Sequence, residues 1–174
     1  MVCHFSNPQI REHVRFCWRG PGGDTAIWNT ELIKAFEQRD DIELHVIAPM
    51  YRMKGLTQTL QIGKVHYYFY QPGVPFLNIS WRHLGRLDAR TNFWWARHCV
   101  QGWIKKINPD IVNLIGAENP HYSMSIWGLK GYPILVSMQS VYSNPDRFKL
   151  VKEDKERSKF ERMVIAENKY FGIN

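Results

Sequence analysis

Glu118 and His121 are the side chains of this sequence whose types and spacing best suit acid–base chemistry. They lie in the segment 116–121 (GAENPH), directly after the apolar run Asp110–Ile115. A carboxylate and an imidazole that reach the same substrate can act as acid and base, or can hold sugar hydroxyl groups. The segment also suits an ordinary helix start, with Asn119 as the cap and a proline in the first turn. The two interpretations are compatible, because such caps often face a ligand.

A glycine-rich turn precedes the first amphipathic stretch. It covers residues 19–25 (RGPGGDT) and contains Gly22, Gly23 and Asp24. Backbone N–H groups at the positive end of a helix suit a phosphate or a sugar hydroxyl, and a plain turn is the alternative. The turn is not a full dinucleotide fingerprint. In addition, residues 48–50 (APM) put no acidic side chain at the end of the next strand, where one would hold a ribose.

Polar residues also follow the apolar run Pro133–Met138. Gln139 and Tyr142 belong to this segment, and polar groups directly after a buried strand need partners, which a ligand or a neighbouring loop can supply. Glu118 and His121 are therefore our predicted catalytic residues. The predicted substrate-binding residues are Gly22, Gly23, Asp24, Asn119, Gln139 and Tyr142.

The charge of the chain is basic but dispersed. Its 174 residues carry a net charge of +7, and no run of five or six Lys or Arg occurs, which argues against nucleic acid as a partner. Residues 81–86 (WRHLGR) join Trp to basic side chains, a combination that suits a membrane interface or, alternatively, a solvated loop with one buried Trp. We expect peripheral contact with anionic membrane.

The sequence shows no pattern of a disulfide framework, a signal peptide, a membrane span or a metal site. Cys3, Cys17 and Cys99 form no CxxC pair, which fits a reducing cytosol better than a disulfide framework. The N-terminus does not have the pattern of a signal peptide, and no apolar window is long enough to span a membrane. No metal cluster is visible, so we expect a cytoplasmic protein that needs no metal or other cofactor.

Apolar runs alternate with amphipathic stretches along the chain. The strands and helices that these stretches form must hold the predicted site residues in place. We expect irregular structure over Tyr51–Gly63, and a loop or broken helix over Val74–Arg86. Expected strands are Val2–Ser6 (with His13–Trp18 as the alternative first strand), Ile42–Ala48, Lys64–Tyr70, Asp110–Ile115, Pro133–Met138 and Tyr170–Ile173. Expected helices are Asp24–Arg39, capped by Asp24 or Thr25, Leu87–Asn108, His121–Leu129 and Asp146–Lys169.

The alternation predicts an α/β, Rossmann-like fold: a parallel sheet with helices on both faces. Ligands bind such sheets outside the carboxyl ends of the strands, which is where the predicted site residues fall. The chain ends inside the expected strand Tyr170–Ile173 without a closing helix, so we expect it to belong to a longer protein.

Taken together, these motifs resemble the retaining, family-4-like glycosyltransferases of GT-B fold, especially those of bacterial capsular and surface polysaccharide synthesis. Their order and spacing match over the whole chain. The matching segments are Val2–Ser6, Gly22-Gly23, Leu44–Pro49, Ile107–Val112, Gly116–His121 and Ser137–Ser140. One departure is that many relatives carry a histidine near Asn113 or Ile115, where this chain has none.

The resemblance implies that residues 1–174 are the N-terminal, acceptor-side domain of a glycosyltransferase, inactive without a C-terminal nucleotide-sugar domain. The whole enzyme would transfer a sugar from a nucleotide-sugar to a saccharide or lipid-linked acceptor, with retention. Two alternatives stay open at this point. One is a nucleotide-binding Rossmann domain of another enzyme, and the other is a non-catalytic, flavodoxin-like interaction module.

Overall fold

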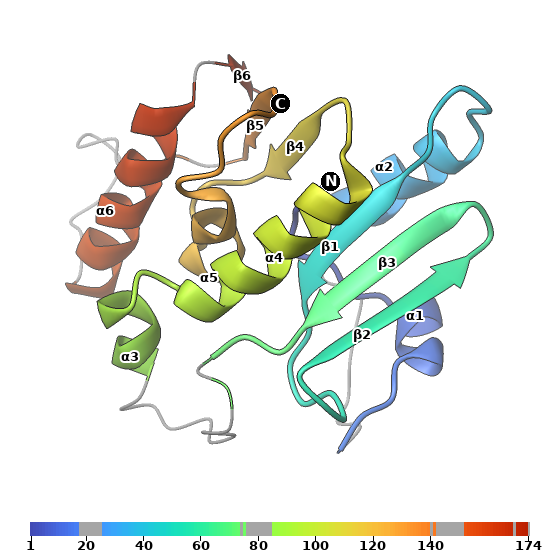
Figure 1. The fold of residues 1–174 in the computed structure, drawn as a ribbon, viewed down its shortest axis with the longest axis horizontal. Helices are drawn as coiled ribbons and strands as arrows, with labels where there is room; N and C mark the ends of the chain where they lie inside the picture. The colour runs from blue at the N-terminus through green and yellow to red at the C-terminus, as the bar shows by residue number, and fades with distance from the viewer. Residues whose placement is uncertain are drawn as a thin grey trace. The chain divides into compact units, whose positions relative to one another are not determined.

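The computed structural model describes residues 1–17, 26–73, 75, 85–139, 141, 152–168 and 170–173. The chain forms two compact units (Figure 1). Unit 1 comprises Met1 and residues 3–72, and unit 2 comprises Val2 and residues 73–174. Each unit combines helices with a small sheet, so the expected α/β class is confirmed. The finer prediction, one Rossmann-like sheet, is not clearly visible in either unit.

Unit 1 contains a mixed sheet of three strands with the order β1-β3-β2. Strands β1 (His45–Pro49) and β3 (Val65–Tyr70) are parallel, whereas β2 (Thr57–Ile62) runs antiparallel to β3. The strands β2 and β3 form a hairpin in which Ile62 pairs with Val65. Strands β1 and β3 confirm the predicted strands in these places, but the purely parallel sheet was wrong here.

Strand β2 lies in a segment for which the sequence predicted irregular structure. That prediction was wrong because both faces of the strand carry polar side chains, which hide the alternating pattern of a strand. The side chain of Gln58 is nevertheless buried. Its amide donates to the backbone oxygens of Arg15 and Lys54, at 2.7 and 3.0 Å, and its carbonyl accepts from the Arg15 N–H at 2.9 Å. A glutamine whose amide is satisfied in this way can face inward, and this is why the hydrophobic pattern did not reveal the strand.

The beginning of the chain also differs from expectation. The alternative strand His13–Trp18 is wrong, because helix α1 occupies Pro8–His13 and Phe16 forms only an isolated bridge with Met53. Asn7 caps this helix by accepting from the Ile10 N–H at 2.8 Å, with proline in the first turn. This is a start signal that the strand assignment overlooked.

Two further elements expected near the N-terminus differ from the structure: an expected strand is not regular, and an expected helix is shorter. The run Val2–Ser6 forms no regular strand, although Cys3 donates to the Ile47 oxygen at 3.1 Å. The expected helix Asp24–Arg39 is present as α2 (Ile27–Glu37). Its N-cap is Ala26, in the left-handed conformation and without a side-chain hydrogen bond, and not the expected Asp24 or Thr25. Asp24 and Thr25 themselves lie outside the described residues.

Unit 2 contains three parallel strands in the order β4-β5-β6. They are β4 (Val112–Ile115), β5 (Ile134–Met138) and β6 (Tyr170–Ile173), in agreement with three of the predicted strands. Its helices are α3 (Gly85–Arg90), α4 (Trp94–Ile107), α5 (Pro120–Ser123), the 3-10 turn η1 (Met124–Ile126) and α6 (Lys152–Glu167). Because β4 and β5 are parallel, their carboxyl ends lie at the same edge of the sheet of unit 2.

The expected helix Leu87–Asn108 is divided between α3 and α4. Asn92 and Phe93 both take left-handed backbone angles, with φ of 48° and 54°, and the helix starts again at Trp94. The Phe93 ring at this break is buried. Helix α4 then follows its predicted period, with Ala96, Cys99, Val100 and Ile104 buried. Within the part of the chain described, no helix is long and apolar enough to cross a membrane.

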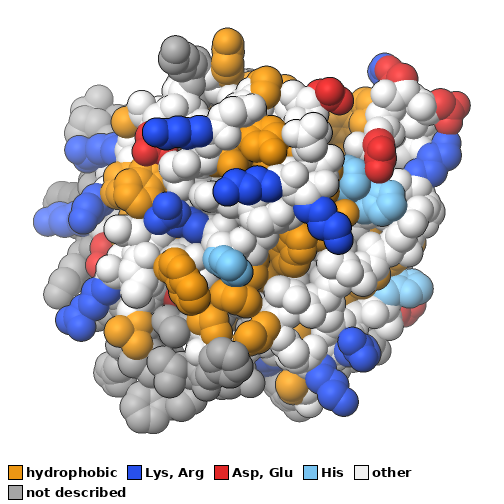
Figure 2. Space-filling view, in the orientation of Figure 1, with side chains coloured by type: hydrophobic (Ala, Val, Ile, Leu, Met, Phe, Trp, Pro, Cys, Tyr) orange, Lys and Arg blue, Asp and Glu red, His pale blue; other side chains and the backbone are white. Residues whose placement is uncertain are grey.

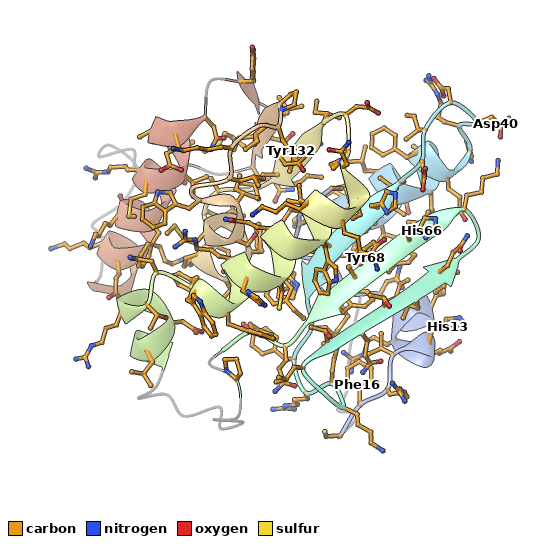
Figure 3. All side chains as sticks on the ribbon, in the orientation of Figure 1. His13, Phe16, Asp40, His66, Tyr68 and Tyr132 are labelled. Atoms are coloured by element: carbon orange, nitrogen blue, oxygen red, sulfur yellow. The ribbon has the colours of Figure 1, made fainter. Side chains whose placement is uncertain are left out.

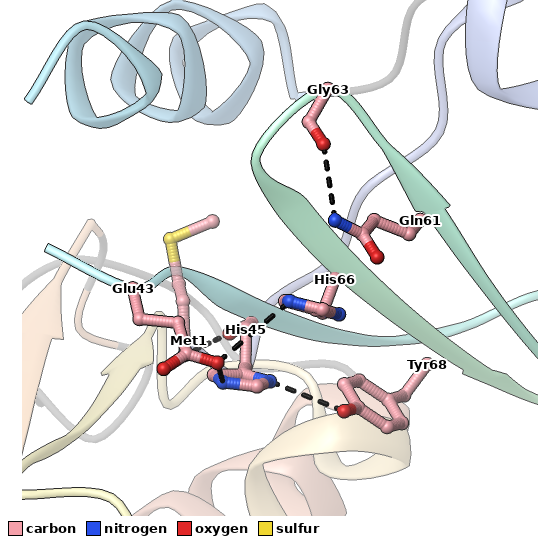
Figure 4. A network of polar contacts seen from close by, with 7 residues as sticks. All are labelled: Met1, Glu43, His45, Gln61, Gly63, His66 and Tyr68. Atoms are coloured by element: carbon pink, nitrogen blue, oxygen red, sulfur yellow. Dashed lines mark hydrogen bonds and ion pairs between the residues drawn. The ribbon is translucent and has the colours of Figure 1, made fainter. Parts of the chain in front are cut away.

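Two stacked histidines lie on neighbouring strands of unit 1, as Figure 4 shows, and Figure 3 labels one of them, His66, on β3. The rings of His45 on β1 and His66 on β3 are 4.8 Å apart and nearly parallel. The Glu43 carboxylate lies 3.0 Å from His45 Nε2 and 3.7 Å from His66 Nε2. His45 Nδ1 is 3.2 Å from the hydroxyl of Tyr68. Burial lowers the pKa of His45, and Glu43 opposes this only in part.

His45 should therefore make unfolding easier in mild acid. Its pKa in the folded protein lies below the ordinary value of about 6.5, so the unfolded chain takes up the proton first as the pH falls below that value. We expect His45→Gln to reduce the loss of unfolding free energy between about pH 7.5 and about pH 5.5, measured by urea denaturation. An equal loss in wild type and His45→Gln would contradict the assignment.

Candidate ligand site at the carboxyl end of β4

The turn at Gly116 shapes the site. Gly116 has a φ of +85°, and its N–H donates to the Ser137 oxygen at 2.8 Å, which continues the pairing of β4 with β5. A Cβ at this position would lie 2.7 Å from both carboxylate oxygens of Glu118 and 2.6 Å from the Tyr122 hydroxyl. Glycine is thus required twice, for the left-handed backbone and for the close approach of two polar groups.

Glu118 is held in place from two sides. The Tyr122 hydroxyl donates to its Oε1 at 3.1 Å, and Arg157 Nε of α6 donates to its backbone oxygen at 3.1 Å. The other carboxylate oxygen, Oε2, is buried and has no hydrogen-bond partner among the described residues. A buried carboxylate oxygen without a donor is costly. A hydroxyl group of a bound ligand would supply the missing donor.

Asn119 starts the short helix α5, as the sequence predicted. Its side chain accepts from the His121 N–H at 3.1 Å, and Pro120 stands in the first turn. The helix is shorter than the expected His121–Leu129, because it gives way to η1 at Met124. The cap holds the backbone of His121 three residues beyond Glu118, so the predicted catalytic pair belongs to one rigid turn.

His121 faces a buried acid that the sequence interpretation missed. Its Nδ1 is 3.9 Å from Oδ2 of Asp88 on α3, and the ring of Phe93 meets the imidazole edge-on at 5.5 Å. The side chain of His121 is 36% exposed, whereas that of Asp88 is only 9% exposed. A partly exposed imidazole near a buried carboxyl group can exchange a proton with a ligand, although the 3.9 Å separation leaves no hydrogen bond between His121 and Asp88.

Burial raises the pKa of Asp88 to about 6. The separation of 3.9 Å from His121 is too long for a hydrogen bond, so the loss of hydration decides this pKa. Perturbed carboxyl groups of this kind occur often at functional sites. The sequence did contain a signal: Asp88 is the only acidic residue between Glu43 and Asp110, in a stretch that is otherwise neutral or basic.

Of the other predicted site residues, some can be placed in the structure and some lie outside the described residues. Gln139 follows β5 directly, and since Gly116 bonds to Ser137, Gln139 belongs to the same edge of the sheet as Glu118. Gly22, Gly23, Asp24 and Tyr142 lie outside the described residues, so whether the glycine-rich turn joins this edge stays a prediction. Asn113 lies near the place where many of the family-4-like enzymes are expected to carry a histidine. Its side-chain oxygen accepts a hydrogen bond from the Ser137 hydroxyl at 3.0 Å.

Nucleophilic and metal chemistry find little support in the described ranges. Burial raises the pKa values of the Cys3 and Cys99 thiols to about 12, which disfavours their thiolate forms at neutral pH. The described residues include no group of three or more His, Cys, Asp or Glu side chains placed to hold a metal ion. Glu118, His121 and Asp88 can offer hydrogen bonding and proton transfer to a ligand.

Comparison with known proteins adds no relative to this picture. The sequence matches no protein-family model and no curated protein. The site is therefore interpreted from its own geometry and from the motifs.

Replacing Gly116 tests the close approach at the turn. Gly116→Ala should lower the free energy of unfolding by about 1–2 kcal/mol more than Gly131→Ala, because the added methyl group collides with Glu118 and Tyr122. Gly131 is a matched control, with a φ of +87° and nothing within 4 Å of an added Cβ. Urea denaturation of both variants measures the difference. Equal losses would mean that the carboxylate does not lie over Gly116.

Asp88 should reduce stability at neutral pH. Because its pKa is raised, its favourable contribution is complete below the ordinary pKa of about 4 and is lost as the pH rises through about 6. Asp88→Asn stays neutral and should raise the free energy of unfolding near neutral pH by up to ~3 kcal/mol, with little effect near pH 4. Urea denaturation at both pH values, with the exposed Asp110→Asn as control, measures this. A destabilised Asp88→Asn at neutral pH would refute the assignment.

Proposed function

We propose that this chain is the acceptor-side, Rossmann-like half of a retaining GT-B glycosyltransferase. In the whole protein, a nucleotide-sugar domain would complete the active site, and a saccharide or lipid-linked acceptor would bind to this half. The single observation that carries the proposal is the buried Glu118 Oε2, which lacks a donor among the described residues at the carboxyl end of a parallel strand. Parallel α/β sheets bind their ligands at this end.

The site suits an acceptor hydroxyl better than a phosphate. Glu118 presents an oxygen that accepts a hydrogen bond, and a carboxylate repels an anionic group. Tyr122 holds the carboxylate through its other oxygen, Oε1, and the carboxylate packs closely over Gly116. An incoming hydroxyl that donates to Oε2 would thus be oriented with a lone pair free for attack on the sugar carbon.

His121 and Asp88 provide the second function of the site. The imidazole is partly exposed, so it can accept a hydrogen bond from a second hydroxyl of the acceptor. The attacking hydroxyl would pass its one proton to Glu118 as the glycosidic bond forms and the bond between the sugar and the diphosphate breaks. The predicted Gly22-Gly23 turn would direct backbone N–H groups at the leaving diphosphate, where negative charge develops. Gln139 and Asn119 would complete the contacts to the acceptor.

The order of the motifs supports the same proposal. The segments Leu44–Pro49 and Gly116–His121 resemble those of the family-4-like enzymes, and they coincide here with β1 and with the turn after β4. Cytoplasmic location at the inner face of the cell membrane belongs to the proposal as well, because nucleotide-sugars are cytoplasmic and the chain is basic.

The test is sugar transfer by the full gene product that contains this chain. A panel of nucleotide-sugars with saccharide and lipid-linked acceptors should give release of nucleoside diphosphate and a glycosylated product. Glu118→Gln and His121→Ala should each lower kcat by about 10²-fold or more, because each removes an oriented polar contact or a proton acceptor. Asp110→Asn, an exposed acid in the same unit, is the control and should keep normal turnover.

Two results would count against the proposal in different ways. Normal rates for both Glu118→Gln and His121→Ala would refute the site while leaving the activity intact. Absence of transfer by the wild-type protein across the panel, together with tight binding of a nicotinamide dinucleotide, would replace glycosyl transfer with dinucleotide chemistry.

A further inference from the structure

We propose that the outer face of helix α4 is a docking surface for an anionic lipid bilayer. The surface, here called the α4 stripe, consists of Trp94, Trp95, His98, Gly102 and Lys105. It belongs to unit 2 and shares no residue with the Glu118 site. Membrane docking can therefore be tested independently of glycosyl transfer.

The spacing of α4 places the stripe on one side of the helix. Trp94, His98, Gly102 and Lys105 are separated by four, four and three residues, and all four are exposed. Residues at these spacings share one face of an α-helix. The buried residues Ala96, Cys99, Val100 and Ile104 occupy the other side. The core of unit 2 thus determines which side of α4 faces outward.

Three aromatic rings gather at the N-terminal end of the stripe. The ring centroid of His98 lies 5.9 Å from that of Trp94 and 5.8 Å from that of Trp95, both in stacked orientation. Trp94 is 55% exposed even so. Tryptophan favours the boundary between lipid headgroups and acyl chains, where its apolar ring is buried and its N–H still finds a partner.

The charges around the stripe are suited to an anionic surface. Helix α4 contains no acidic residue, and Lys105 and Lys106 stand in its last turn. Asp88, the nearest acid before it in sequence, is buried, and the next acid after it is Asp110. In Figure 2, hydrophobic and histidine side chains lie together over α4, with Lys and Arg side chains near them. Lysines near a membrane surface are attracted by anionic lipids.

The stripe is held rigidly enough to act as a surface. Gln101 donates from its side chain to the backbone oxygens of Ser125 and Trp127, at 3.1 and 3.0 Å. Arg97 lies over the Trp127 ring at 4.8 Å. These contacts attach the middle of α4 to η1 and to the residue that follows it, and the exposed tryptophans belong to the first turn of the same helix.

A flat bilayer fits the stripe better than a nucleic acid strand. Trp94 and Lys105 are eleven residues apart, which is roughly 16 Å along a helix axis, so a planar partner can touch both ends at once. Binding to a single strand would instead use open ring faces for base stacking. Here His98 stacks on both indoles and covers part of their faces.

The experiment is co-sedimentation of the whole chain with vesicles of phosphatidylcholine alone and of phosphatidylcholine mixed with phosphatidylglycerol. Binding should require phosphatidylglycerol and should weaken as salt is raised. The double variant Trp94→Ala/Trp95→Ala should bind about tenfold more weakly, and Lys105→Glu/Lys106→Glu should lose at least about tenfold at low salt. The lysine pair is exposed, so its replacement leaves the core of unit 2 untouched.

Trp28 provides the matched control, since it is 58% exposed on α2, a helix that also carries Glu31. Trp28→Ala should bind vesicles as wild type does. Equal binding to both vesicle types, an equal loss in Trp28→Ala, or unchanged binding in both double variants would overturn the proposal. So would tighter binding to single-stranded DNA than to vesicles. Normal sugar transfer without vesicle binding would refute docking alone, whereas vesicle binding without transfer would refute the proposed function alone.

Discussion

The close approach of Glu118 and Tyr122 to Gly116 is the contact on which the site depends. A side chain at residue 116 would occupy the space that now holds the carboxylate, and the left-handed backbone would be strained. The same residue donates its N–H to Ser137, so the turn also ends the β4–β5 pair. Gly116 thus takes part both in the pairing of β4 with β5 and in the close packing of the carboxylate.

Polar groups on this turn are positioned by stepwise hydrogen bonding. Tyr122 holds one oxygen of Glu118, Arg157 holds its backbone, and Asn119 caps the helix that carries His121. Each of these bonds satisfies a group that would otherwise be buried without a partner. At this site, the oxygen left over, Oε2, and the buried carboxyl group of Asp88 both carry a cost of burial. Costs of this kind are typical of sites that bind or react.

The fold was predictable where a simple pattern decides it. The strands β3, β4, β5 and β6 and the helix α4 follow apolar runs or a 3.6-residue period, because burial on one or both faces is their main source of stability. The pattern failed at β2, where the buried Gln58 is satisfied by hydrogen bonds to the distant Arg15 and the nearby Lys54, and between α3 and α4. There, Asn92 and Phe93 take left-handed backbone angles that interrupt the helix, and the 3.6-residue period of the sequence continues across the break without revealing it.

The sequence by itself determined the chemistry available after β4: a carboxylate, a capping amide and an imidazole within four residues, at the end of an apolar strand. Local rules suffice there, because capping and turn formation depend on neighbouring residues. Only the tertiary structure decided that Asp88 stands behind His121, that Tyr122 orients Glu118, and that Trp94 faces outward. The first and the last of these depend on how α3 and α4 pack in unit 2, and packing joins residues that no local pattern relates.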